Sequence, residues 1–372
     1  MHNMIRNFRP NKNVMVSGMD RIRAQNVNHK VWDYLKRYQS SYFVEQKLYW
    51  EVKKNKAKLE EKSQQISSLM VQCEAYYKSV ESAPMEIKPL LLYYGMVGLS
   101  KCLILSGDNK YTLSAIEEAN DEHSTHGLGF SAKNPAERQI RDSNEILNEF
   151  CKIQISGVYP LLRQCYSNLP IAPQTKLSVK ELLSLVPEFY KEYVLYFNEP
   201  PLTWHCYSHM GKNETTDTIQ IVEFADWDFL QHRKDEKEKY PDTIVRWFPE
   251  LSDNYEKKEG VDDFFWLKDK ATSVDDYIFV SDLMTLEQYA FSKINGIRVT
   301  DIDVHFLLMF ILSNLVRYRQ DKWAKLIRRQ ENDQIFLIES FIELSAQKFP
   351  LLILRELDNI NYQFSGQVAT LG

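Results

Sequence analysis

A group of cations and an aromatic ring follows an apolar segment in the last third of the chain. The segment "LVRYRQDKW" contains Arg317, Arg319, Lys322 and Trp323. Guanidinium forks suit phosphate oxygens, and a tryptophan or tyrosine ring can stack on a nucleobase. Cations at the end of a helix also complement the helix dipole without binding any ligand. The segment therefore indicates either a phosphate-binding surface or an ordinary helix terminus.

A second polar segment, "HSTHGLGF", places His123 and His126 in a loop with two glycines. Imidazole rings and exposed backbone amides can contact a phosphate or a similar ligand. Loops on a rigid scaffold often carry binding residues. His126 is therefore a ligand-binding candidate, and the alternative is a plain loop with a helix-stop glycine.

Two Arg–His pairs resemble the spacing used by HEPN ribonucleases, namely Arg23 with His29 and Arg298 with His305. In such enzymes the histidine acts in acid–base chemistry on the ribose and the arginine holds phosphate. A motif this short arises roughly once by chance in a chain of this composition. Arg298 and His305 form the better pair, because His305 begins a predicted core helix.

Other catalytic or metal-binding patterns are weak or absent in the sequence. His205 and His209 in "WHCYSHM" would share a helix face and could hold a metal, but the context looks like a strand and lacks the HExxH pattern. We find no GxGxxG, P-loop or GxSxG motif. We expect no metal, no cofactor and no catalytic triad. The scattered cysteines lack a CxxC pair and fit reduced thiols in a cytoplasmic protein.

One segment, "IKPLLLYYGMVGLSKCLIL" from Ile87 to Leu105, is apolar on almost every side. Such a helix should lie at the centre of a fold and be contacted from several directions. Gly95 and Gly98 would let another backbone or a ligand approach closely. A second apolar helix, 306–316, cannot bury itself alone, so we expect it to pack on the first.

Two lysines flank this apolar segment, Lys88 and Lys101. They lie about 20 Å apart along a helix, so they cannot hold the same phosphate. Lys101, together with Tyr94, is the candidate for a ligand site, and the other lysine is expected to be a helix-end residue that reaches toward water.

The pattern of elements predicts a mainly α (α+β) protein with a helical core and a small antiparallel β insert. Helical periodicity covers both ends of the chain, whereas short β-branched and aromatic runs follow Pro200 and Pro201. Helix is expected to return at about Thr285. The predicted parts are an N-terminal arm (1–29), a helical region (30–199), the β insert (200–282), a C-terminal helical region packing on the first (283–362) and a tail (363–372).

The net charge of −5 gives no bulk signal for nucleic acid or for an anionic membrane. The N-terminus lacks an apolar run of signal-peptide length. Segment 90–105 comes closest to a membrane span but is short and contains Lys101, so a buried core helix is the preferred interpretation. We therefore expect a cytoplasmic protein with no membrane partner.

Three segments taken together resemble the YaaC-like family of bacterial proteins: "IKPLLLYYGMVGLSKCLIL", "HGL" and "HFLLMFILSNLVRYRQDKW". The chain also resembles, more distantly, HEPN-type helical domains. The resemblance implies a bacterial cytoplasmic protein, and HEPN-type domains often serve in anti-phage and toxin systems. Some are ribonucleases, whereas others act as nucleotide-sensing or scaffolding partners of an effector such as a sirtuin-like NADase.

Because the Arg–His motif is poor, we favour a non-catalytic nucleotide-sensing or regulatory subunit that joins an effector protein, in an oligomeric complex. One alternative is a metal-independent ribonuclease that uses Arg298 and His305. Another is a structural interaction module whose β insert docks a partner. The predicted ligand site comprises Tyr94, Lys101, His126, Arg317, Arg319, Lys322 and Trp323.

Overall fold

The chain forms two compact units in a computed structural model. The helical unit comprises 1–179 and 305–372, and the β unit comprises 180–304. The described residues are 19–24, 26–48, 55–107, 112–118, 126–130, 146–167, 171–199, 201–211, 219–224, 255–257, 264–267, 279–282, 287–291, 293–294, 296–328 and 335–365. His123 lies outside them, as does the run "TIVRWFPEL" (243–251), which is one of the short runs predicted to form strands in the β insert.

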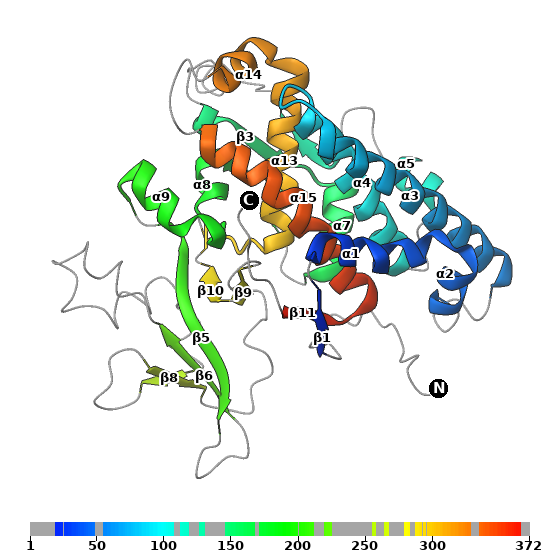
Figure 1. Cartoon of the computed structure of the whole chain (residues 1–372), viewed down its shortest axis with the longest axis horizontal. Coiled ribbons are helices and arrows are strands. Elements are labelled where there is room, and N and C mark those ends of the chain that lie inside the picture. The colour runs from blue at the N-terminus through cyan, green and yellow to red at the C-terminus, as the bar shows by residue number, and fades with distance from the viewer. Residues whose placement is uncertain are drawn as a thin grey trace. The chain divides into compact units, whose positions relative to one another are not determined.

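Two long helices, α3 (Lys56–Ser82) and α4 (Lys88–Gly107), pack side by side in the helical unit (Figure 1). Fourteen of the twenty residues of α4 are buried, which confirms the prediction of a central helix. The buried Lys62 of α3 donates a hydrogen bond to the carbonyl of Leu105 at 3.0 Å. This contact supplies a cation to the C-terminal end of α4, where the helix dipole favours positive charge.

The glycines of α4 accommodate side chains of α3 rather than a ligand. A Cβ added at Gly98 would lie 2.5 Å from the Sγ of Cys73, and one at Gly95 would lie 2.8 Å from the ring of Tyr77. Real Cβ atoms do not approach other atoms this closely, because atoms in protein interiors are already packed to contact. The close approach predicted for these glycines is therefore an approach by α3.

The second apolar helix, α13 (Asp301–Tyr318), contacts α4 through aromatic rings. The ring centroid of Tyr93 lies 5.5 Å from that of Phe306 and 5.7 Å from that of Phe310. Phe306 also stacks on Tyr159 of α7 (Val158–Tyr166) at 5.9 Å. These contacts confirm the predicted packing of the two apolar helices.

Side-chain caps fix where two of the long helices begin. The Asn55 side chain accepts a hydrogen bond from the backbone N–H of Lys58 at 3.0 Å, at the start of α3. At the start of α13, the backbone N–H of Thr300 donates to the Asp303 carboxylate at 2.8 Å. The backbone N–H of Asp303 donates back to the Thr300 hydroxyl at 3.3 Å. This reciprocal pair is the acidic capping box that the sequence predicts.

The helical unit contains further helices and strands besides α3, α4, α7 and α13. A parallel pair joins β1 to β11, and a three-stranded antiparallel sheet has the order β2-β3-β4. The bounds of these strands and of the other helices of this unit are β1 (Met19–Arg23), α1 (Val27–Leu35), η1 (Lys36–Gln39), α2 (Ser41–Leu48), α5 (Leu113–Glu118), β2 (Leu128–Gly129), η2 (Ile146–Asn148), β3 (Phe150–Ile153), β4 (Lys176–Ser178), α14 (Gln320–Ile327), α15 (Ile335–Asp358) and β11 (Asn361–Ser365).

The β unit contains one antiparallel sheet with the strand order β7-β8-β6-β5-β10-β9. Its bounds are α8 (Val179–Leu183), which begins at the unit boundary, η3 (Pro187–Phe189), α9 (Tyr190–Phe197), β5 (Thr203–Gly211), β6 (Ile219–Phe224), β7 (Tyr255–Lys257), β8 (Phe264–Leu267), β9 (Phe279–Ser281) and β10 (Gln288–Phe291). The fold is thus mainly helical with a small antiparallel insert, as the sequence predicts.

The predicted helix at about Thr285 is wrong, because Gln288–Phe291 forms strand β10. Its residues pair with β5 on one side and with β9 on the other. The local sequence suits a helix, but these pairings satisfy the backbone on both sides of the strand. A short segment follows its non-local partners rather than its own propensity.

Among the described residues, one helix is long and apolar enough to cross a membrane, namely α4. Sixty-seven percent of its apolar window is buried inside the protein. A buried core helix passes the same test of length and composition as a membrane span. The neighbours of α4 on several sides account for its apolar surface.

Candidate functional site

Three segments of the helical unit place three of the predicted ligand residues, together with Tyr93, in one region. Helix α4 supplies Tyr93 and Lys101, the loop before β2 supplies His126, and the end of α13 supplies Arg317. The ring of His126 lies 5.4 Å from that of Tyr93. We call Tyr93, Lys101, His126 and Arg317 the His126 cluster.

The loop that carries His126 is held rigidly by its glycine. Gly127 has a φ of +72°, and a Cβ there would collide with Pro160 at the start of α7. The backbone N–H of Tyr159 donates to the carbonyl of His126, and that of Gln154 donates to the carbonyl of Gly127, each at 3.0 Å. Only glycine tolerates both this conformation and this approach. The "HGL" motif therefore fixes the imidazole against α4.

The charges of the cluster act on one another. Burial, together with the charges of Arg317 and Lys101, lowers the pKa of His126 from 6.5 to about 4. Burial raises the pKa of the Tyr93 phenol well above its usual value, although the charge of Arg317 opposes that rise. At neutral pH the imidazole of His126 and the phenol of Tyr93 are therefore both neutral.

Several buried polar atoms here have no hydrogen-bond partner in the part of the chain that the structure describes. They are the Tyr93 hydroxyl, His126 Nδ1 and Arg317 Nε. Tyr93 is completely buried, so its hydroxyl cannot be satisfied by bulk water. Buried polar groups are nearly always paired, and an exception calls for a ligand, an ion or an ordered water. The cluster therefore has the donors and the charge to hold an anion.

Two of the predicted ligand residues have structural contacts instead. The ammonium group of Lys322 forms a buried ion pair with Glu149 at 3.1 Å. Trp323 is only 3% exposed, so neither face of its ring is open to a nucleobase. Its indole N–H lacks a partner within the described ranges. Both side chains anchor α14 to the helical unit.

Tyr94, Arg319 and the two lysines of α4 lie in different surroundings in the structure. The Tyr94 ring packs against Tyr76 of α3, with centroids 5.8 Å apart. Arg319 is the half-buried residue that precedes α14. Lys88 forms an ion pair with Glu343 of α15, which accounts for the helix-end lysine. Lys101, farther along α4, is the lysine whose charge acts on His126.

Two aromatic residues of this region, Tyr93 and Tyr318, were not predicted from the sequence. Tyr318 is the last residue of α13 and is 66% exposed, and the guanidinium of Arg317 lies 5.1 Å from its ring centroid. A signal was present, because Tyr318 stands between two arginines in "RYR". Tyr93 carried no signal of its own, since it lies within an apolar run.

The proposed ribonuclease pair occupies two different environments. His305 is completely buried, and its Nδ1 lies 2.7 Å from the Ser345 hydroxyl. Its ring stacks on Phe341 at 5.3 Å. Arg298 belongs to the β unit. A general base must reach the ribose hydroxyl, so the burial of His305 favours a role in the core.

The remaining histidine patterns give no metal site among the described residues. His205 and His209 both lie on β5, and a four-residue separation along a strand spans about 13 Å. That separation is too long for both side chains to bind one ion. His29 is exposed on α1 and faces Asp33 at 3.5 Å.

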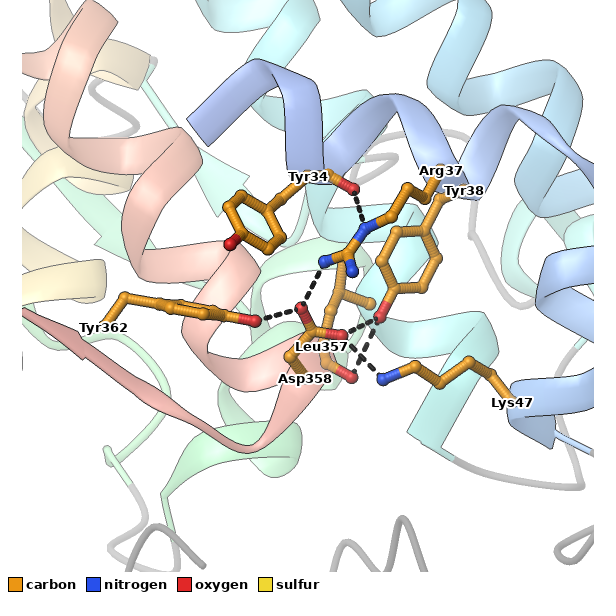
Figure 2. A network of polar contacts seen from close by, with 7 residues as sticks. All are labelled: Tyr34, Arg37, Tyr38, Lys47, Leu357, Asp358 and Tyr362. Carbon is orange, nitrogen blue, oxygen red and sulfur yellow. Dashed lines mark hydrogen bonds and ion pairs between the residues drawn. The ribbon is translucent and has the colours of Figure 1, made fainter. Parts of the chain in front are cut away.

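A second polar network is centred on the Asp358 carboxylate at the end of α15, and four side chains donate hydrogen bonds to it (Figure 2). Its Oδ1 accepts from the Tyr38 hydroxyl and from Lys47, each at 2.7 Å. Its Oδ2 accepts from Tyr362 at 2.6 Å and from Arg37 at 3.2 Å. These donors come from η1, α2 and β11, so the network ties the N-terminal elements to the C-terminal ones. A satisfied network of this kind stabilises the fold.

The fold and the site define a class: a mainly helical protein with an inserted antiparallel sheet and a cationic cluster beside its central helix. A family model described as YaaC-like protein matches residues 33–357. The chain therefore belongs to the YaaC-like protein family. No significant match is found among curated proteins or among solved structures.

The substitution His126→Gln should make the helical unit less sensitive to acid. The folded pKa of about 4 lies below the ordinary 6.5, so the unfolded chain binds more protons between these values. The wild type therefore loses stability as pH falls below 6.5. We expect the variant to lose about 1 kcal/mol less between pH 7.5 and pH 5, after discounting for the part-exposed ring. Urea unfolding at both pH values measures this, and equal losses would contradict it.

Proposed function

We propose that this protein is a non-catalytic regulatory subunit that binds a nucleotide at the His126 cluster. The observation that carries the proposal is the set of buried, unpartnered polar atoms, Tyr93 Oη, His126 Nδ1 and Arg317 Nε, within the described part of the chain. A phosphate oxygen accepts hydrogen bonds from hydroxyl, imidazole and guanidinium groups. Two nearby cations favour an anionic ligand over a neutral one.

The biological setting follows by analogy. The family resemblance and the distant likeness to HEPN-type helical domains support a regulatory role beside an effector protein, in bacterial anti-phage defence. A sirtuin-like NADase is one example of such an effector. In this proposal the nucleotide biases the subunit toward or away from its effector by binding one conformation better than another. The expected assembly is a cytoplasmic hetero-oligomer.

The test is thermal unfolding of the full chain against a panel of nucleotides, deoxynucleotides and NAD. A ligand that binds only the folded protein raises the unfolding midpoint. We expect a shift with at least one compound, and we expect Arg317→Ala to weaken that binding at least tenfold. Arg328→Ala is the matched control, because Arg328 is an exposed arginine just beyond the end of α14.

Two outcomes would overturn this proposal. The first is the absence of any shift with the whole panel. The second is a shift that Arg317→Ala and Arg328→Ala reduce equally, since that would indicate attraction by general surface charge. In either case the effector partner should be sought by co-purification with the unmodified chain.

A further inference from the structure

Tyr318 presents an open aromatic face directly beside the His126 cluster. Its side chain is 66% exposed at the last residue of α13. The Arg317 guanidinium lies 5.1 Å from the ring centroid, and its Nη2 donates to Asn314 Oδ1 at 3.3 Å. The charge of the same arginine also acts on the buried Tyr93 and on His126. Exposure by itself is ordinary for a single surface tyrosine, so the argument rests on the position of this ring beside the guanidinium of a cluster residue.

We propose that Tyr318 is the platform on which the base of a nucleoside phosphate stacks, while the His126 cluster holds the phosphate. This inference rests on the proposed function and adds the residue that recognises the base. The ligand class that fits is one flat ring and one anionic group joined by a short linker. A nucleoside monophosphate has this arrangement.

The other aromatic candidates fit the stacking role less well. Trp323 is buried, and the Tyr94 ring already packs on Tyr76. The ring of Tyr93 is enclosed by Phe306 and Phe310, so only its hydroxyl can serve a ligand. Tyr318 is the aromatic residue of this group whose ring is largely open to solvent.

The chemistry of the platform also predicts its selectivity. Stacking on an aromatic ring discriminates little between the bases, because every base has a π face. A guanidinium held against the same tyrosine adds a favourable cation–π contact and fixes the ring. We therefore expect purine and pyrimidine nucleotides to bind within about tenfold of one another, with the purines tighter because of their larger rings.

The experiment uses the full chain and two kinds of probe, inorganic phosphate and the four ribonucleoside monophosphates, in isothermal titration calorimetry. We expect Tyr318→Ala to weaken nucleotide binding about tenfold and to leave phosphate binding within about twofold. Tyr318→Phe should bind both probes like the wild type, because it retains the ring. Arg317→Ala should weaken the binding of both phosphate and nucleotides.

The possible failures can be told apart. If nucleotides bind and Tyr318→Ala leaves their affinity unchanged, the platform assignment is wrong while the nucleotide site stands. Equal weakening of phosphate and nucleotide by Tyr318→Ala would also overturn it, because the tyrosine would then act on the anion site. If neither probe binds the wild type, both the platform and the proposed function fail.

Discussion

Replacing Asp358 with alanine is expected to lower the free energy of unfolding of the helical unit by about 3 kcal/mol. The carboxylate is 2% exposed and accepts four hydrogen bonds, two from cations and two from phenols. Its removal leaves the Tyr38 hydroxyl without its short acceptor and two cations without their counter-charge. Urea unfolding of the full chain, followed by circular dichroism, measures the loss.

The matched control is Glu343→Ala, which removes a different ion pair from the same helix. Glu343 is 52% exposed where it meets Lys88. Exposed ion pairs contribute little, so we expect a change within about 0.5 kcal/mol. Asp358→Asn preserves the volume of the side chain but not its charge. Its loss in the free energy of unfolding should lie between the losses of Asp358→Ala and Glu343→Ala. A loss below about 1 kcal/mol in Asp358→Ala would mean that water replaces the network at little cost.

Asp358 also determines the direction in which the free energy of unfolding changes with pH in the acid range. Burial by itself would raise the pKa of Asp358, but the charge of Lys47 and hydrogen bonds from Lys47, Tyr362 and Tyr38 hold that pKa below its usual 3.8. A depressed carboxylate pKa stabilises the fold above the unfolded value and loses this effect as pH falls through the folded value. The difference between wild type and Asp358→Asn should therefore shrink only below about pH 4.

The helical core could be predicted because each of its signals is local. The apolar run of α4, the capping box at Thr300 and the glycine of "HGL" each specify a structure within a few residues. Two apolar helices in one chain must then bury each other, which places Tyr93 against Phe306. The packing of the two apolar helices also places Arg317, at the end of α13, near α4. The position of His126 depends on its loop, and the sequence gives no reason for its proximity to Arg317.

The roles of individual site residues could not be predicted, because they depend on distant partners. Lys322 is neutralised by Glu149, 173 positions away in the sequence. The Asp358 network joins side chains more than 300 positions apart. Nothing near Trp323 in the sequence distinguishes a buried tryptophan from an exposed one. The prediction of a helix at β10 was wrong for the same reason, because the pairing of this strand with β5 overrides the helical preference of its local sequence.

The two polar clusters of the helical unit differ in a way that bears on function. At Asp358 every cation and phenol has an acceptor, so nothing remains for a ligand to satisfy. In the His126 cluster, three buried atoms have no hydrogen-bond partner among the described residues: Tyr93 Oη, His126 Nδ1 and Arg317 Nε. An anion that paired with them would remove the free-energy cost of leaving them unpaired. Sites that break the rules of polar satisfaction are the ones where a ligand is expected.

Replacing Gly98 with alanine is expected to destabilise the helical unit by about 2 kcal/mol, although alanine is the better helix former. The added Cβ would lie 2.5 Å from Cys73 Sγ. The two helices must therefore separate locally, or the sulfur must move into occupied space. Urea unfolding measures the loss. Gly107→Ala at the end of the same helix is the control, because its Cβ would meet Cys165 Sγ at an ordinary 3.8 Å.

The double variant Cys73→Ala with Gly98→Ala separates this contact from any general effect of the glycine. Alanine at position 73 removes the sulfur, so the new methyl group at position 98 has room. We expect the double variant to be more stable than the sum of the single losses predicts, with a coupling of about 2 kcal/mol. Additive losses would show that Gly98 is needed for its backbone rather than for the space above it. A double variant that is more stable than the single losses predict would instead show that the contact between Cys73 Sγ and Gly98 limits how closely α3 and α4 approach at this point.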